Sequence, residues 1–283
     1  MEHILAAIDP SAYATSVCGY AGWAAQRLSL PVELLHVVRR QDPVTARRDL
    51  SGAIGLGVKS ELMEELVRLS EAGSRVEIEK GRVILEAGEQ LLREAGIDNV
   101  MATHRHGGVV ETIVEREETA RLLVIGKRGI DHESAPDQIG SIIERVVRAS
   151  AKPVLVASRA FAPPSHVVFA YDARPAARRA LERLANSPLF EGLPITIVMA
   201  EAQGEAKRAE LAAAQDSFSE SHEVTAVSEP GKAEQVIPAA VAAARDPLLV
   251  MGAYGHSPLR RMILGSTTTE MIRTVKAPVL LVR

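Results

Sequence analysis

Short apolar stretches alternate along the chain with longer stretches in which apolar residues recur at helical spacing. The strand candidates are apolar on both faces, as at 4–8 and 167–171, which predicts parallel strands buried between helices. In each half a small-residue helical stretch follows the first strand, and a proline, Pro31 or Pro194, opens the next strand. This order predicts an α/β fold of right-handed βαβ units, with a doubly wound sheet in each half.

Three landmarks occur twice in the same order, which indicates a tandem repeat. They are a strand that ends in aspartate, a strand that ends in Gly-x-x-Gly, and a Gly-Ser pair that opens a helix followed by proline and a closing strand. In the two halves they lie at Asp9, Gly126 and Gly140, and at Asp172, Gly252 and Gly265. Three landmarks in one order are a stronger signal than any of them alone.

The repeat divides the chain into two predicted domains, at residues 1–160 and 166–283. The linker at 161–165 contains two prolines, which interrupt regular structure. Asp9 to Gly126 spans 117 residues, whereas Asp172 to Gly252 spans 80, so the first half carries a surplus of 37.

The surplus falls in a charged segment at 43–96. Leucines at i, i+4 and i+7 predict an extended helical excursion there, at Leu62, Leu66 and Leu69. The stretch 52–60 nearly spells a phosphate-binding P-loop, but Val58 separates glycine from lysine and no apolar strand precedes it. We interpret Gly55–Ser60 as a flexible loop that could serve as a lid.

Composition narrows the class of protein. A content of 47% hydrophobic and 24% charged residues excludes disordered and low-complexity chains. The net charge of −3 gives no electrostatic reason to bind nucleic acid or a membrane surface. The one cysteine, Cys18, cannot form an internal disulfide or a cysteine-based zinc site. With no signal-peptide pattern and no apolar run of about 20 residues, we expect a cytoplasmic protein without membrane insertion.

The second half carries the motif Gly252-x2-Gly255-x9-Gly265-Ser266 after an apolar strand. Gly252 ends the strand, and Gly255 permits a turn with positive φ and a close backbone approach. Gly265, Ser266 and Thr267 then open a helix whose free N–H groups and dipole favour an anion, and whose hydroxyls add donors. The spacing predicts a phosphate cradle between two glycine turns and a helix start.

The motif, the aspartate that ends the strand and the closing Pro-Val-Leu strand at 278–280 resemble the universal stress protein family in its tandem form. The resemblance covers nearly the whole chain apart from 43–96. Four residues match every fixed position of that family's G-2x-G-9x-G-[ST] ATP-binding signature, namely Gly252, Gly255, Gly265 and Ser266. The resemblance implies two doubly wound, mostly parallel five-stranded sheets of the adenine-nucleotide alpha-hydrolase-like, Rossmann-like type. It also implies that their last strands pair as an internal pseudo-dimer.

The resemblance further implies a nucleotide site in the second half, with the aspartate near the adenosine and the glycines and hydroxyls near the ribose and phosphates. Its residues would be Asp172, Gly231, Gly252, Gly255, Gly265, Ser266 and Thr267. The ligand would be ATP, ADP or AMP, with Mg²⁺ as an optional companion, and it would act as a regulatory ligand in the stress response.

The first half keeps the counterparts of these residues but departs from the signature. Its weaker candidate site comprises Asp9, Gly107, Gly126, Gly129, Gly140 and Ser141. Ten residues rather than nine separate Gly129 from Gly140, and three acids stand where a phosphate would approach, at Asp131, Glu133 and Asp137. Lys127 and Arg128 offset these acids in part, so we expect the second half to be the better site.

Several residues also have simpler interpretations. The Gly265-Ser266 pair could be only a helix N-cap, and Asp172 could cap the helix that Pro175 begins. His104 and His106 share one face of a strand, but with no third ligand in view we expect solvated surface histidines rather than a metal site. Two cations in the loop between Gly255 and Gly265, Arg260 and Arg261, are equally consistent with phosphate contacts and with solvation.

No Ser-His-Asp set, carboxylate pair or metal cage stands out, so we expect no catalytic residues and no enzyme, with slow ATP hydrolysis or phosphotransfer as a weaker hypothesis. The alternative to a nucleotide-binding protein is a nucleotide-independent scaffold that uses surfaces such as 43–96. Expected partners are an adenine nucleotide, unidentified proteins, and a second copy of the chain as a further option.

Overall fold

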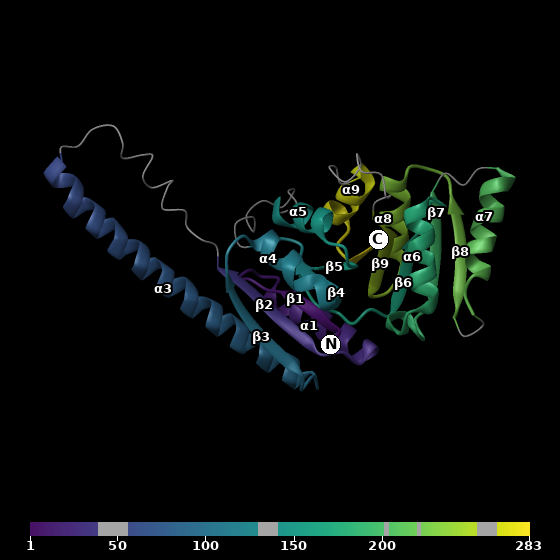
Figure 1. Cartoon of the computed structure of the whole chain (residues 1–283). Helices are drawn as coiled ribbons and strands as arrows, with labels where there is room; N and C mark the ends of the chain where they lie inside the picture. The colour runs from purple at the N-terminus through teal and green to yellow at the C-terminus, as the bar shows by residue number, and fades with distance from the viewer. Residues whose placement is uncertain (39–55, 130–140, 201–203, 220–221, 254–264) are drawn as a thin grey trace.

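A computed structural model describes residues 1–38, 56–129, 141–200, 204–219, 222–253 and 265–283 of the chain. Its strands form a single ten-stranded sheet in the order β3-β2-β1-β4-β5-β10-β9-β6-β7-β8 (Figure 1). The strands of the first half are β1 (His3–Ala7), β2 (Val32–Val38), β3 (Val100–His106), β4 (Ala120–Gly126) and β5 (Val154–Ala157). Those of the second half are β6 (His166–Ala170), β7 (Ile195–Ala200), β8 (Val224–Glu229), β9 (Pro247–Gly252) and β10 (Val279–Val282).

Within each half all neighbouring strands are parallel, which confirms the predicted doubly wound α/β fold. The expected pairing of the last strands is also present, because β5 and β10 join antiparallel with Leu155 opposite Leu280. Both strands are buried along their whole length, and an open edge would leave their N–H and C=O groups unpaired. The two expected five-stranded sheets are therefore halves of one continuous sheet.

Helices cover both faces of this sheet. One layer contains α1 (Ala14–Leu28), α3 (Leu56–Glu94), α6 (Pro175–Asn186) and α7 (Glu205–Asp216). The other contains α4 (Val109–Arg116), α5 (Ser141–Ala149), α8 (Ala233–Ala243) and α9 (Ser266–Thr274). Alternate strand residues serve the two cores, since Val124 packs into the first and Leu123 into the second. Two short 3₁₀ helices complete the fold, η1 (Glu117–Thr119) and η3 (Pro188–Phe190).

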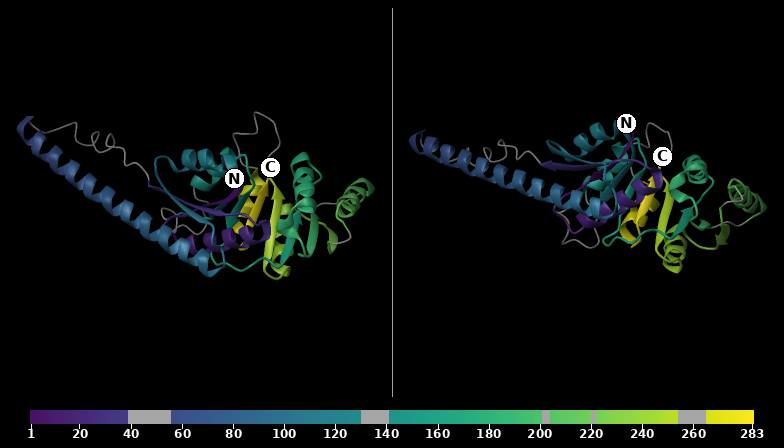
Figure 2. Two further views of the ribbon diagram at one scale, coloured as in Figure 1. Left: turned by 60° about the horizontal axis from the view of Figure 1, so that its bottom comes forward. Right: turned by 90° about the horizontal axis from the view of Figure 1, so that it is seen from below.

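Helix α3 is the feature in which the first half differs most from the second. Its 39 residues span about 58 Å at 1.5 Å per residue, and its N-terminal part extends away from the body (Figure 2). Its C-terminal part packs on β2, β3 and α1, where Leu85 and Leu92 are buried. The expected helix is present, but its last turns are the ordinary crossover helix of the first half rather than part of an excursion. The prediction of a loop at Gly55–Ser60 is wrong from residue 56 onward, because α3 begins at that residue and continues through Val58.

Candidate functional site

The predicted residues of the second half gather at the carboxyl ends of its parallel strands. Asp172 follows β6, Gly231 follows β8, and Gly252 is the last residue of β9. Gly265 precedes α9, which leads into β10 beside β9. In doubly wound sheets this edge is where ligands bind. Gly255, Arg260 and Arg261 lie outside the described residues.

Asp172 forms a turn before α6 rather than a helix cap. Its Oδ1 accepts a hydrogen bond from the backbone N–H of Arg174 at 3.0 Å, and its Oδ2 lies 3.5 Å from the Arg174 Nε. The side chain is 56% exposed, so its carboxylate is accessible at the strand edge. The helix itself begins at Pro175 as predicted, without a side-chain cap.

Gly252 is required by packing between β9 and α6. A Cβ at this position would lie 2.5 Å from the backbone carbonyl carbon of Ala176 and 2.6 Å from the N atom of Ala177. The first turn of α6 therefore rests directly on the end of β9, which brings Asp172 to the same edge. The glycine that opens the predicted motif thus has a structural role whether or not a ligand is present.

The start of α9 offers backbone donors for an anion. Its first i to i−4 hydrogen bond runs from the Thr269 N–H to the Gly265 carbonyl at 2.9 Å, which leaves the amides of residues 266–268 ahead of the helical ladder. Gly265 provides no side-chain cap, and Ser266 is exposed. These amides and the helix dipole favour negative charge.

Glu234 is a residue of this region that the sequence did not reveal. It lies in the first turn of α8, and its Oε1 accepts a hydrogen bond from the Thr267 hydroxyl at 3.1 Å. The Thr267 hydroxyl, which was predicted to bind phosphate, therefore donates its hydrogen bond to the Glu234 carboxylate. No local motif signals this contact, because the two residues are 33 positions apart.

The first half has a cavity of about 390 Å³ at the carboxyl ends of β1, β2 and β4. Three residues of the weaker candidate site line it, namely Asp9, Gly126 and Gly129. A Cβ on Gly129 would lie 2.8 Å from the Asp9 Oδ2, so the two landmarks are in direct proximity. Gly107 follows β3 with a φ of +154°, Gly140 lies outside the described residues, and Ser141 is the first residue of α5.

Helix α3 adds two residues to the wall of this cavity, Glu77 and Lys80. The two form an ion pair of 2.7 Å with each other. Sequence reasoning missed them because it treated the whole of 43–96 as an excursion. The i, i+3 spacing of Glu77 and Lys80, just before the buried part of α3, is the sequence pattern that could have indicated this ion pair.

Lys127 binds the other half of the molecule. Its Nζ donates a hydrogen bond to the carbonyl of Val275, at the C-terminal end of α9, at 2.9 Å. Burial, with a smaller effect from the charge of Arg128, lowers the pKa of Lys127 to about 8. The ammonium group therefore binds at the junction of the halves, and the acids that it was expected to offset, Asp131, Glu133 and Asp137, lie outside the described residues.

The predicted histidine pair proves to be a row of three. Register places His36 of β2 opposite His104 of β3, and the rings of His104 and His106 are 5.5 Å apart. His36 is buried with its Nδ1 2.9 Å from the carbonyl oxygen of Ile8. His106 is exposed as expected, but His104 is only partly so, because α3 packs on β3. Burial, followed by the charges of His36 and His106, lowers the pKa of His104.

Within the part of the chain that the structure describes, two other features bear on function, metal ligation and membrane crossing. Among the described residues, no group of three or more His, Cys, Asp or Glu side chains is arranged to hold a metal ion. None of the described helices combines the length and the apolar character needed to cross a membrane.

Comparison with known proteins covers both halves of the chain. The family model described as "Universal stress protein family" matches residues 1–158 and 191–283. The curated "Universal stress protein Slr1230" of Synechocystis sp. (strain ATCC 27184 / PCC 6803 / Kazusa) is 32% identical over 292 residues, covering 100% of each chain.

Solved structures show the same fold. A universal stress protein from Archaeoglobus fulgidus DSM 4304 has a TM-score of 0.70 at 22% identity, with 99% of this chain and 95% of that chain covered. Protein PA1789 of Pseudomonas aeruginosa PAO1 has a TM-score of 0.59 at 16% identity, with 99% and 92% covered. Together with the family model and the full-length relative, the repeated fold and its motifs lead to one conclusion. The chain belongs to the universal stress protein family.

Proposed function

We propose that the chain binds ATP, ADP or AMP at the carboxyl-end edge of its second half and uses the nucleotide as a regulatory ligand. The observation that carries this proposal is the start of α9, where the amides of residues 266–268 precede the helical ladder beside the end of β9. Phosphate groups are the ligands that such a helix start favours. The spacing of Gly252, Gly255, Gly265 and Ser266 gives the same assignment independently.

The other end of the nucleotide would lie toward β6. The Asp172 carboxylate is accessible there and can accept hydrogen bonds from a ribose hydroxyl or an adenine amino group. A micromolar affinity, which suits a sensor of cellular nucleotide, corresponds to about −8 kcal/mol. Mg²⁺ would accompany the phosphates as an optional partner.

The first half is the weaker candidate despite its cavity. Asp9 and Glu77 place carboxylates in the cavity wall. Of the cations in this wall, Lys80 pairs with Glu77, Lys127 donates to the carbonyl of Val275, and Arg128 lies beside Lys127. The sequence adds three further acids between residues 131 and 137, outside the described residues. Like charges of this kind disfavour a phosphate.

Calorimetric titration with ATP, ADP and AMP tests the assignment. Gly265→Glu adds bulk and a negative charge at the helix start, so we expect it to abolish binding. The matched variant Gly140→Glu changes the same motif position of the first half and should retain wild-type affinity. Loss of binding in Gly140→Glu alone would move the site to the first half, and no binding to wild type at millimolar nucleotide would refute the proposal.

We propose no enzymatic role. The described residues around the α9 start include Asp172 and Glu234, but Asp172 accepts a hydrogen bond from the Arg174 backbone and Glu234 accepts one from the Thr267 hydroxyl, and we assign neither a catalytic role. Phosphate release from ATP should therefore not exceed that of Gly265→Glu. A rate clearly above this control would establish hydrolysis at the site. The expected setting for a nucleotide sensor of this kind is the cytoplasm.

A scaffold function is the second candidate, and exposed apolar residues on α3 favour it. Val76 is 53% exposed and Val83 is 52% exposed, seven residues apart on one face of the helix. Capture of the same protein partners with and without ATP would support a scaffold that does not depend on nucleotide. Partners that change with ATP would support the sensor.

A further inference from the structure

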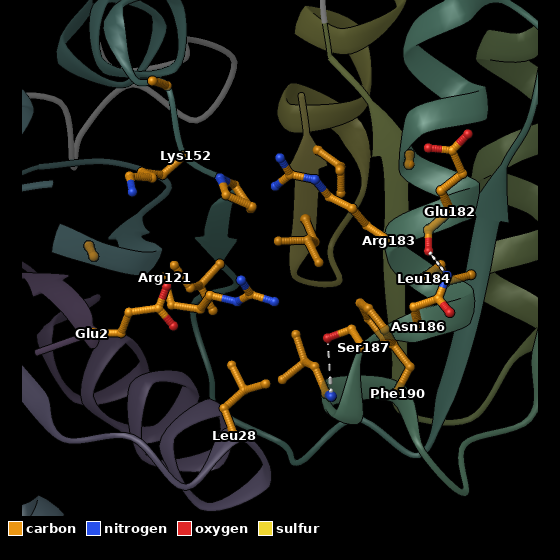
Figure 3. Close-up of a pocket in the computed structure, with 18 residues that line it drawn as sticks. Glu2, Leu28, Arg121, Lys152, Glu182, Arg183, Leu184, Asn186, Ser187 and Phe190 are labelled. Carbon is orange, nitrogen blue, oxygen red and sulfur yellow. Dashed lines mark hydrogen bonds between the residues drawn. The ribbon is translucent and has the colours of Figure 1, made fainter. Parts of the chain in front are cut away.

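A second and larger cavity lies between the two halves, in the helix layer that contains α1 and α6 (Figure 3). Its volume is about 620 Å³, within the range of small-molecule pockets. Its walls come from the end of α1, the start of β4, the residues before β5, α6, η3 and β10. It shares no lining residue with the 390 Å³ cavity of the first half, and it includes none of the predicted nucleotide-binding residues.

The cavity is held open by contacts across the junction. The Nε of Arg27, near the end of α1, donates to the carbonyl of Leu189 in η3 at 2.6 Å, and its Nη2 donates to the carbonyl of Glu191. The side chains of Leu189 and Phe190 are buried, so η3 is held both by these apolar contacts and by the hydrogen bonds from Arg27. A pocket with walls of this kind exists before a ligand arrives, which lowers the cost of binding.

The cavity lining combines apolar side chains with cationic ones. Buried side chains supply the apolar surface, at Leu122, Leu184, Leu189, Phe190, Leu280 and Val282. Arg121 of the first half and Arg183 of the second extend toward each other across the space, with Lys152 at its side (Figure 3). None of these three side chains forms an ion pair or a hydrogen bond with another described residue.

Two acids also line the cavity, Glu2 and Glu182. Figure 3 shows the Glu182 carboxylate directed away from the space that Arg121 and Arg183 face. The lining therefore carries three cations against two acids, and Figure 3 shows the guanidinium groups of Arg121 and Arg183 directed into the space. Such an arrangement selects an anion over a cation.

The repeat shows what a related position accommodates. Tyr20 and Arg183 each stand eleven residues after the aspartate that follows the first strand of their half, Asp9 or Asp172. Beside Tyr20 the linker residue Phe161 packs edge-on, with ring centroids 4.9 Å apart. Beside Arg183 the corresponding space is the cavity. At the Tyr20 end of the junction the space therefore holds an aromatic ring, that of Phe161. At the Arg183 end the cavity has an apolar lining of the same kind, with cations in addition.

We propose that this cavity is a binding site for a small amphipathic anion, an apolar body the size of a ring or short acyl chain that carries one carboxylate or phosphate. The apolar body would lie against Leu184, Phe190 and Leu280, and the anionic group would accept hydrogen bonds from Arg121 and Arg183. Because both halves supply its walls, the ligand would stabilise their junction. This site does not depend on nucleotide binding.

Calorimetric titration of the full chain with decanoate and with decyl phosphate, below their micelle concentrations, tests the site. We expect at least one of them to bind, and the comparison distinguishes a carboxylate from a phosphate ligand. Arg121→Gln and Arg183→Gln should each weaken binding about tenfold, the loss of one charge-assisted hydrogen bond. The matched variant Arg208→Gln, on the exposed face of α7 at the far edge of the second half, should bind like wild type.

Three results would overturn the proposal. The first is absence of binding of both probes at millimolar concentration. The second is equal binding of decyltrimethylammonium, which would show an apolar surface without charge selection. The third is unchanged affinity in the Arg121→Gln, Arg183→Gln double variant, provided that its thermal unfolding matches wild type. Gly265→Glu should retain probe binding, so failure of the nucleotide proposal leaves this one separately testable.

Discussion

The buried carboxylate of Glu33 allows the stability of the first half to be tested quantitatively. Glu33 lies on β2 with no exposed side-chain surface, and Arg116 of α4 binds it through two hydrogen bonds of 2.9 Å each. The His3 Nε2 lies 3.1 Å from the Glu33 Oε2, the oxygen that also accepts from the Arg116 Nη2. Burial alone would raise the pKa of Glu33, but hydrogen bonds from His3, Thr103 and Arg116 together outweigh it and hold the pKa below its usual value.

Glu33→Gln keeps the shape of the side chain but removes its charge. The amide of glutamine keeps one oxygen that can accept from Arg116, but its NH2 group is a donor and cannot accept the second hydrogen bond, and the Arg116 guanidinium loses its counter-ion. Removing one partner of a fully buried pair costs about 3–5 kcal/mol, but the Arg116 side chain is 31% exposed and retains some water. We therefore expect the free energy of unfolding to fall by about 2–3 kcal/mol.

Urea denaturation at pH 7 measures this loss, with Glu111→Gln as the matched control. Glu111 pairs with Arg145 at 2.9 Å, but both side chains are more than half exposed, so its loss should cost less than about 0.5 kcal/mol. The lowered pKa of Glu33 also predicts that its contribution is present above the unfolded pKa of about 4.5 and is lost as pH falls further. Equal destabilisation by the two variants would refute the role assigned to the buried network.

Three further predictions concern the two halves and their sites. The pKa of Lys127 is about 8 when folded and 10.5 when unfolded, so the unfolded chain binds more protons between these values and stability should rise with pH across that window; Lys127→Met should remove this rise in urea midpoints measured at pH 7.5 and pH 10. Gly252→Ala should lower the free energy of unfolding by about 1–3 kcal/mol in thermal denaturation, because its Cβ would lie 2.5 Å from the Ala176 carbonyl carbon; an unchanged midpoint would contradict the packing role. Glu234→Gln removes a negative charge beside the α9 start and should tighten ATP binding roughly threefold to tenfold by calorimetry, whereas weaker binding would indicate that the carboxylate supports the ligand.

Much of the fold was predictable because its strands are buried on both faces. Stretches such as 122–125 and 248–251 lie in the middle of the sheet, where apolar residues are needed on each side. The glycines and aspartates after these strands mark the carboxyl-end edge, so their approximate arrangement also followed. The pairing of β5 with β10 came from the family resemblance, since short apolar strands do not specify which edge they join.

The contacts that sequence reasoning missed join residues far apart in the chain. Lys127 and Val275 are separated by 148 positions, and no periodicity predicts that a loop lysine of one half binds a helix end of the other. Glu234 lies in the first turn of α8, and the packing of α8 against α9 brings its carboxylate to Thr267. The division of α3 into a core part and a projecting part was missed for a related reason. Amphipathic spacing shows that a helix has an apolar face, but not what covers that face.

A crystal structure of the chain grown or soaked with ATP tests the central claim most directly. We predict a triphosphate at the start of α9, hydrogen-bonded to the backbone amides of residues 266–268, with the adenosine directed toward Asp172. A triphosphate in the first-half cavity instead, or an α9 start without nucleotide at millimolar ATP, would contradict the claim.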